Sequence, residues 1–118
     1  MKKEIQPLES EINLLHERIC AALSDTTRIM ILYLLSESPL FVNEISDALD
    51  APQSTVSRHL RVLRERNLVS TKRQGTAVQY SLADGRIIDA LNLMRSILND
   101  QVSAEAAITQ PAEAAGTS

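Results

Sequence analysis

Six basic side chains gather between residues 53 and 80 of a chain that is otherwise acidic. They are Arg58, Arg61, Arg64, Arg66, Lys72 and Arg73, and the same window holds a single acid, Glu65. The window has a net charge of +5, whereas the remaining six basic and fourteen acidic residues give −8. A run of Lys and Arg can be no more than a solvated face, but charge sorted in this way is typical of a surface that binds a polyanion.

Residues 53–66 are predicted to form the helix that carries the first part of this charge. Its apolar residues Val56, Leu60 and Leu63 recur at helical spacing, and Pro52 stands where a missing N–H does no harm. A polar face of this kind suits a DNA major groove, where side chains reach bases and phosphates. His59 could instead pack inside the motif, but the neighbouring arginines favour a position near DNA. The residues expected to contact DNA are Gln53, Ser54, Thr55, Ser57, Arg58, His59 and Arg61.

A β-hairpin is predicted directly after this helix. Residues 68–73 are rich in β-branched side chains, residues 77–82 form a second short strand, and Gly75 supplies the positive φ of a tight connection. Residues 42–49 form a short amphipathic helix that residues 50–52 join to the helix at 53–66. Two such helices followed by a hairpin make a winged helix-turn-helix. The hairpin residues expected beside the DNA are Lys72, Arg73, Gly75 and Thr76.

Three stretches of this chain resemble the ArsR/SmtB family of dimeric bacterial repressors. They are Ala-Leu-Ser-Asp-Thr-Thr-Arg at 22–28, Gln-Ser-Thr-Val-Ser-Arg-His-Leu at 53–60, and Leu-Arg-Glu-Arg-Asn-Leu-Val at 63–69. The resemblance extends from about residue 15 to residue 98. It implies a mainly α fold of the α+β class, a winged helix-turn-helix with about five helices and a two-stranded hairpin. It also implies a dimer formed by the first and last helices.

The apolar pattern of the terminal helices agrees with such a dimer. Residues 8–23 carry one apolar stripe, and residues 84–99 present a broader apolar face than one small domain is expected to cover, whereas residues 26–35 are apolar almost all round and should be the buried central helix. Two recognition helices related by a two-fold axis would face major grooves about 34 Å apart, so the operator should be an inverted repeat.

Length and composition predict one domain over residues 8–100, with an extension at 1–7 and a disordered tail at 101–118. No apolar run approaches the roughly 20 residues that span a bilayer, so no membrane is expected. A single cysteine excludes an internal disulfide, and the expected location is the cytoplasm.

The family resemblance implies two kinds of metal site, and neither has suitable ligands here. One uses a Cys-x-Cys pair before the recognition helix, but Phe41 and Asn43 stand at those positions. The other uses acids and histidines of the last helix. Asp84 and Asp100 match its acids, but Arg86 and Ile97 replace its histidines, and a guanidinium cannot bind a cation. Both sites are therefore expected to be lost, and no cofactor is predicted.

His16 and Cys20 are the remaining candidates for an effector site. Four residues apart on a helix, they share a face, and two copies across a dimer axis could supply four zinc ligands. Cys20 could alternatively form a redox-sensitive disulfide with its twin. The commoner reading of a lone Cys is a small buried apolar residue, and a His beside Glu17 is usually solvated.

The sequence thus predicts a sequence-specific DNA-binding regulator, a homodimeric repressor of an inverted-repeat operator in double-stranded DNA, with an unknown effector. The alternatives are a metal- or redox-responsive repressor that uses Cys20 with His16, and a winged-helix adaptor that binds protein instead of DNA. A basic rather than apolar face on the helix and hairpin favours DNA over the adaptor. An enzyme is excluded because the sequence offers no nucleophile–base pair and no Gly-rich phosphate loop, with three glycines in all.

Overall fold

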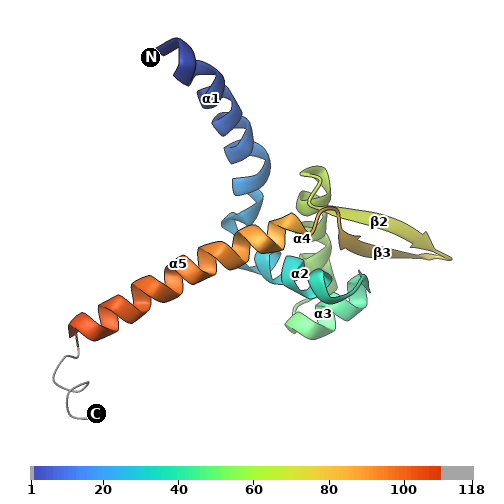
Figure 1. Ribbon diagram of the computed structural model, residues 1–118. Coiled ribbons are helices and arrows are strands. Elements are labelled where there is room, and N and C mark those ends of the chain that lie inside the picture. The colour runs from blue at the N-terminus through green and yellow to red at the C-terminus, as the bar shows by residue number, and fades with distance from the viewer. Residues whose placement is uncertain (1, 110–118) are drawn as a thin grey trace. The chain divides into compact units, whose positions relative to one another are not determined.

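The computed structural model describes the backbone of residues 2–109 and the side chains of residues 5–107. It has two compact units, which meet in sequence between Gly85 and Arg86. The first unit contains four α-helices and a small sheet, and the second contains one long helix (Figure 1). The predicted winged helix-turn-helix is confirmed.

The first unit begins with a helical segment that changes its winding twice. Helix α1 (Lys2–Leu15) continues as a π-helical turn, η1 (His16–Cys20), and a 3-10 turn, η2 (Ala22–Ser24). The π turn is closed by a hydrogen bond from the N–H of Ala21 to the carbonyl of His16 at 2.9 Å. The sequence predicted one helix from Leu8 to Leu23. The helix instead starts earlier and includes Pro7, which lies in its second turn.

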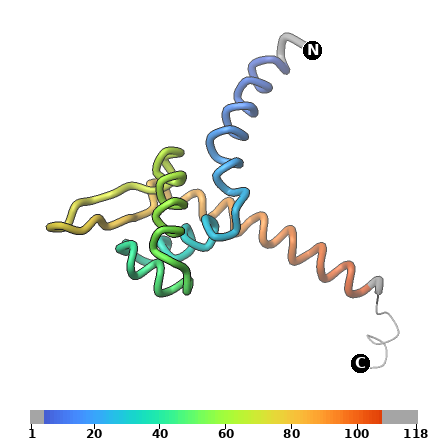
Figure 2. Tube along the Cα trace, turned by 180° about the vertical axis from the view of Figure 1, so that it is seen from behind, coloured from blue at the N-terminus to red at the C-terminus, as the bar shows by residue number. Residues whose placement is uncertain are grey.

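The core of the first unit is formed by α2 (Thr26–Glu37), α3 (Val42–Leu49) and α4 (Gln53–Glu65). The tube view from behind shows these helices gathered beside the hairpin (Figure 2). Helix α2 is less completely buried than the sequence predicted, since Met30 is half exposed whereas Ile31, Leu32 and Leu35 are buried. The central side chains are fully excluded from solvent and come from all three helices: Ile31, Leu32, Ile45, Val56, Leu60 and Leu63. The apolar positions predicted for the recognition helix are therefore its core contacts.

Local capping explains where α2 and α3 begin. The Asp25 carboxylate accepts the backbone N–H of Thr27 at 2.8 Å and so satisfies a free donor in the first turn of α2. At the start of α3, the Glu44 carboxylate accepts the N–H of Phe41 at 2.9 Å. Asp50 ends α3 in the left-handed region, with φ of 49°, and this reversal turns the chain into α4.

The wing, residues 69–82, consists of β2 (Val69–Gln74) and β3 (Ala77–Leu82). Gln74 pairs with Ala77, so the connection has two residues, and Gly75 adopts the expected positive φ of 63°. A third strand, β1 (Leu40–Phe41), was not predicted. It pairs with β3 through Leu40–Tyr80 and Phe41–Gln79, which gives an antiparallel sheet with the order β1-β3-β2.

The second unit is the helix α5 (Arg86–Thr109). It extends past the predicted end at Asn99, because the stretch after Asp100 is rich in Ala and contains neither Gly nor Pro before Pro111. Residues 110–118 of the predicted tail, like Met1 of the extension, lie outside the described residues. Large apolar side chains of α5 are exposed: Leu93, Met94, Ile97, Leu98 and Val102.

Candidate nucleic-acid interface

Burial of one side of α4 fixes which of its side chains face solvent. Val56, Leu60 and Leu63 have no exposed surface, so the opposite side of the helix points outward. Between residues 53 and 61, the polar face of α4 therefore consists of residues that are exposed or, for Thr55, half-buried: Gln53, Ser54, Thr55, Ser57, Arg58 and Arg61. These are the positions that the sequence predicted, with the exception of His59.

The N-terminal end of α4 favours a negatively charged ligand. Its first turn contains no acidic residue, and Pro52 makes no side-chain cap that would occupy the free N–H groups. The partial positive charge of a helix N-terminus adds to that of the arginines. Hydroxyl and amide groups of the polar face lie on this same half of the helix, so neutral hydrogen-bonding groups and the positive end of the helix are close together.

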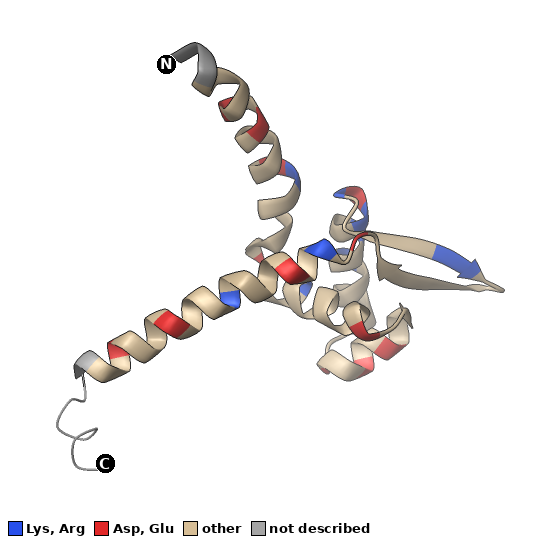
Figure 3. Cartoon of the chain, in the orientation of Figure 1, with Lys and Arg blue, Asp and Glu red and all other residues tan. Residues whose placement is uncertain are grey.

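The wing carries the second part of the positive charge. Lys72 and Arg73 are exposed on β2 and pair with Gln79 and Val78 of β3. Colouring by charge shows this basic segment near the tip of the hairpin, whereas acidic residues mark α3 (Figure 3). Gly75 and Thr76 form the exposed tip. No Cβ contact limits substitution at Gly75, so its positive φ alone favours glycine there.

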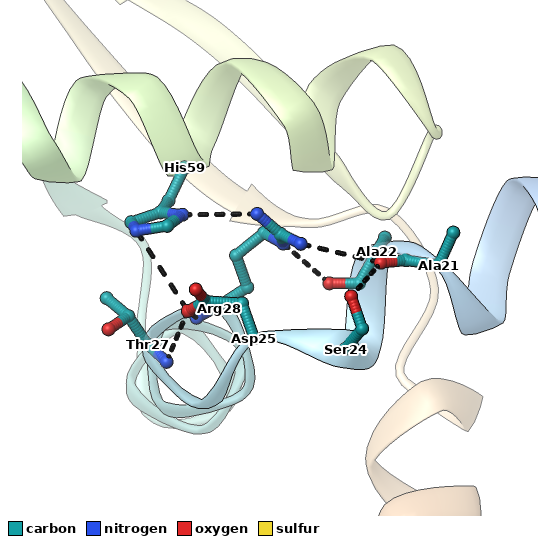
Figure 4. A network of polar contacts seen from close by, with 7 residues as sticks. All are labelled: Ala21, Ala22, Ser24, Asp25, Thr27, Arg28 and His59. Atoms are coloured by element: carbon teal, nitrogen blue, oxygen red, sulfur yellow. Dashed lines mark hydrogen bonds and ion pairs between the residues drawn. The ribbon is translucent and has the colours of Figure 1, made fainter.

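His59 is the one predicted DNA contact of α4 that is buried. Its residue surface is only 7% exposed, and its imidazole is directed from α4 to the start of α2 (Figure 4). Nδ1 lies 3.3 Å from Nη1 of Arg28, and Nε2 lies 3.9 Å from Oδ1 of Asp25. The sequence reading missed Arg28 and Asp25 as partners. Asp25 was readable as a helix cap before an apolar run, but a contact between positions 28 and 59 has no local sequence signal.

The Asp25 carboxylate joins this network to the cap of α2. Partial burial raises the pKa of Asp25, but the N–H groups of Thr27 and Arg28, together with the neighbouring His59 imidazole and the positive charge of Arg28, outweigh it. The pKa of Asp25 therefore lies below its ordinary value of 3.8. The carboxylate is charged throughout the neutral range and remains available as an acceptor.

His16 and Cys20 begin and end the π turn, and both are exposed. Cys20 is thus not the buried apolar residue that a lone cysteine usually is. Of the positions matched to family metal sites, Phe41 ends β1 and Asn43 is exposed in α3, while Ile97 and Asp100 are exposed on α5. Among the side chains that the structure describes, no three His, Cys, Asp or Glu residues converge as metal ligands would.

No helix within residues 2–109 has both the length and the apolar character needed to cross a membrane.

Comparison with known proteins identifies a matching protein family and similar relatives. The family model described as "Bacterial regulatory protein, arsR family" matches residues 25–71, which run from the Asp25 cap through α4 to the first strand of the wing. The transcriptional regulator NmtR of Mycobacterium tuberculosis is 37% identical over 86 residues, which are 73% of this chain and 72% of that protein.

Solved structures show the same fold. A homodimeric winged helix-turn-helix DNA-binding domain of Mb0332 from Mycobacterium bovis has a TM-score of 0.72 at 23% identity, covering 84% of this chain and 91% of that one. The crystal structure of Rv0081 from Mycobacterium tuberculosis has a TM-score of 0.70 at 27% identity, covering 86% and 97% of the two chains.

Proposed function

Since the chain belongs to the ArsR family of bacterial regulatory proteins, we propose that this DNA-binding transcriptional regulator is a homodimeric repressor of an inverted-repeat operator. It is a regulator and not an enzyme. The observation that carries the proposal is the outward polar face of α4 combined with the basic wing, on a chain that is otherwise acidic.

Each part of this surface has a distinct role in the proposal. Gln53, Ser54, Thr55 and Ser57 read base edges in the major groove, because hydroxyl and amide groups can both donate and accept hydrogen bonds there. The arginine and lysine side chains bind phosphates, and Gly75 and Thr76 allow the wing tip to approach the DNA backbone closely. The phosphate-binding residues are Arg58, Arg61, Lys72 and Arg73.

The dimer in this proposal uses the exposed apolar residues of α1 and of α5. In α1 these are Leu8, Ile12 and Leu15, and in α5 they include Ile97 and Leu98. Covering such side chains releases water from apolar surface, which is the usual driving force of association. The homodimeric state of the similar Mycobacterium bovis domain supports this assignment. A dimer presents two α4 helices, hence the inverted repeat.

The effector is proposed to act away from the usual metal positions of the family. Phe41, Asn43, Arg86 and Ile97 lack the thiolate or imidazole that such sites need. One specific observation favours a second candidate, a metal- or redox-responsive repressor: Cys20 and His16 are both exposed on the π turn.

The proposal is tested by fluorescence anisotropy with the DNA upstream of the protein's own gene, in a series of salt concentrations. Four phosphate-binding cations per protomer make eight per dimer, so log K should fall with log salt with a slope that approaches about −7. Absence of salt-dependent binding would contradict a repressor and would favour the protein-binding adaptor.

The effector is tested in the same titration with oxidant, zinc, arsenite or chelator. Cys20→Ser is the matched control, since it removes the thiol and keeps a side chain of similar size. Release of DNA by oxidant or metal in the wild type alone would make Cys20 the sensor. Binding that ignores all four treatments would indicate a constitutive repressor or one with a different inducer.

A further inference from the structure

We propose that His59 is a positioning residue of operator recognition, which holds α4 at one rotation through Arg28 and Asp25 and makes no contact with DNA itself. The inference rests on the proposed function, because it concerns how that function reads sequence. Among the residues of α4 predicted to contact DNA, His59 is the one that is buried, with 7% of its surface exposed.

The Arg28 guanidinium is held on the backbone that precedes α2. Its Nε donates to the carbonyl of Ala22 at 2.6 Å, and its Nη2 donates to the carbonyl of Ala21 at 3.4 Å. The third nitrogen, Nη1, meets Nδ1 of His59 (Figure 4). A planar guanidinium with two of its nitrogens fixed has little freedom to turn. Arg28 therefore presents a donor of fixed direction to α4.

The chemistry of arginine also fixes the state of the imidazole in this contact. A guanidinium has donors and no acceptor, so Nδ1 must accept the hydrogen bond with its lone pair. The imidazole hydrogen is then on Nε2, and that nitrogen faces the Asp25 carboxylate at 3.9 Å. His59 thus has a donor-bearing partner on one side and an anionic partner on the other. Only one orientation of the ring satisfies both.

Directional contacts of this kind can fix the rotation of α4 about its own axis, which apolar packing alone does not do. Packing of Leu60 and Leu63 holds α4 against the core but is not directional, so it fixes the rotation of the helix less sharply than hydrogen bonds do. A rotation of about 10° moves a side-chain end about 5 Å from the helix axis by roughly 1 Å. Base-edge hydrogen bonds are lost over such a distance, whereas attraction between charges and phosphates falls off slowly. Loss of the His59 contact should therefore reduce sequence discrimination before it reduces general DNA binding.

The test compares two probes: a duplex enriched from a random-sequence pool by the wild-type dimer, and a scrambled duplex of equal length. His59→Leu removes the polar contacts at similar size. His59→Asn keeps an acceptor, because its amide oxygen can take the place of Nδ1. We expect His59→Leu to weaken binding to the enriched duplex roughly tenfold, with less than about a twofold effect on the scrambled one. His59→Asn should restore most of the loss.

Arg58→Ala is the matched control, an exposed neighbour that is proposed to bind phosphate. It should weaken binding to both duplexes and lower the magnitude of the salt slope by about 1.8, since a dimer loses two contacts. His59→Leu should leave the slope unchanged. Equal weakening on both duplexes with a lower slope would overturn the inference and make His59 a DNA contact.

A double-mutant cycle with Arg28→Met identifies the partner. If His59 acts through Arg28, the double variant should lose no more discrimination than the worse single variant, whereas additive losses would overturn the pairing. Circular dichroism establishes the folded fraction. If His59→Leu does not fold, the test uses Arg28→Lys, which keeps the charge but not the planar guanidinium that donates to Nδ1 of His59, and wild-type discrimination in that variant would equally refute the role. Failure of the wild type to enrich any duplex would refute the proposed function instead.

Discussion

Neighbouring residues of α4 have opposite surroundings, because each step along a helix turns the side chain by about 100°. Arg58 is exposed, whereas His59 is buried against Arg28. Arg61 returns to the solvent side, and Arg64 does so near the end of the helix. Position on the helix face, more than residue type, therefore decides which of these side chains can meet DNA.

Arg58→Ala and Arg61→Ala should each weaken operator binding and leave the dimer intact. Each removes one phosphate contact per protomer, so the magnitude of the salt slope should fall by about 1.8. Anisotropy titrations in a salt series measure both quantities. Arg64→Ala is the matched control, an exposed arginine of the same helix outside the proposed contact set. An equal effect of Arg64→Ala would mean that net charge, and not position, determines affinity.

Asp25→Ala should lower the free energy of unfolding by about 1 kcal/mol at neutral pH, because it removes the cap of α2. Since the pKa of Asp25 is lowered in the folded protein, the carboxylate stabilises the fold fully above about pH 3.8, and this contribution is lost as pH falls through the folded-state pKa. Asp25→Asn keeps an oxygen that can accept the cap hydrogen bond, but its amide does not gain a proton as the pH falls. In urea denaturation, the advantage of the wild type over Asp25→Asn should shrink below about pH 3.8. A constant difference would contradict this.

At the scale of elements, periodic apolar patterns predicted α2, α3 and α4 well, but they missed the early start of α1, the late end of α5 and the contacts between distant residues. Val56, Leu60 and Leu63 placed α4 within a residue of its observed end, and Gly75 placed the turn of the wing. The two residues of β1 are too few to show a period, and they form a strand only because Tyr80 and Gln79 offer an edge. The inward side of His59 was missed for a related reason, since its partner is 31 residues away.

The wing should contribute affinity without sequence preference. Lys72→Ala combined with Arg73→Ala removes two exposed cations from each protomer and four from a dimer. The magnitude of the salt slope should therefore fall by about 3.6, with equal loss of affinity on enriched and scrambled duplexes. Lys72→Arg with Arg73→Lys keeps the charges and is the control. A loss confined to the enriched duplex would mean that the wing reads bases.

At the scale of the whole molecule, exposed apolar residues of α5 are the feature that a single chain leaves unexplained. Leu98→Asp should dissociate the dimer, since the substitution occurs twice across a two-fold axis and places a charge on apolar surface. Loss of two buried leucines alone weakens association roughly a hundredfold or more. Sedimentation equilibrium measures the change. Asn99→Asp adds the same charge at the neighbouring exposed position and should have little effect. A Leu98→Asp dimer of wild-type affinity would place the interface elsewhere.

The short strand β1 makes one part of the wing stiffer than its tip. Its two residues pair with Gln79 and Tyr80, so the middle of the hairpin is a three-stranded sheet and the part toward the tip is a two-stranded ribbon. Two-stranded ribbons twist and bend more easily than wider sheets. A force on the tip therefore bends the segment that carries Arg73 and Gly75, while the part of the hairpin paired with β1 stays in place. In the proposed DNA complex, the tip of the wing could then adjust to a DNA groove of varying width while the position of α4 is unchanged.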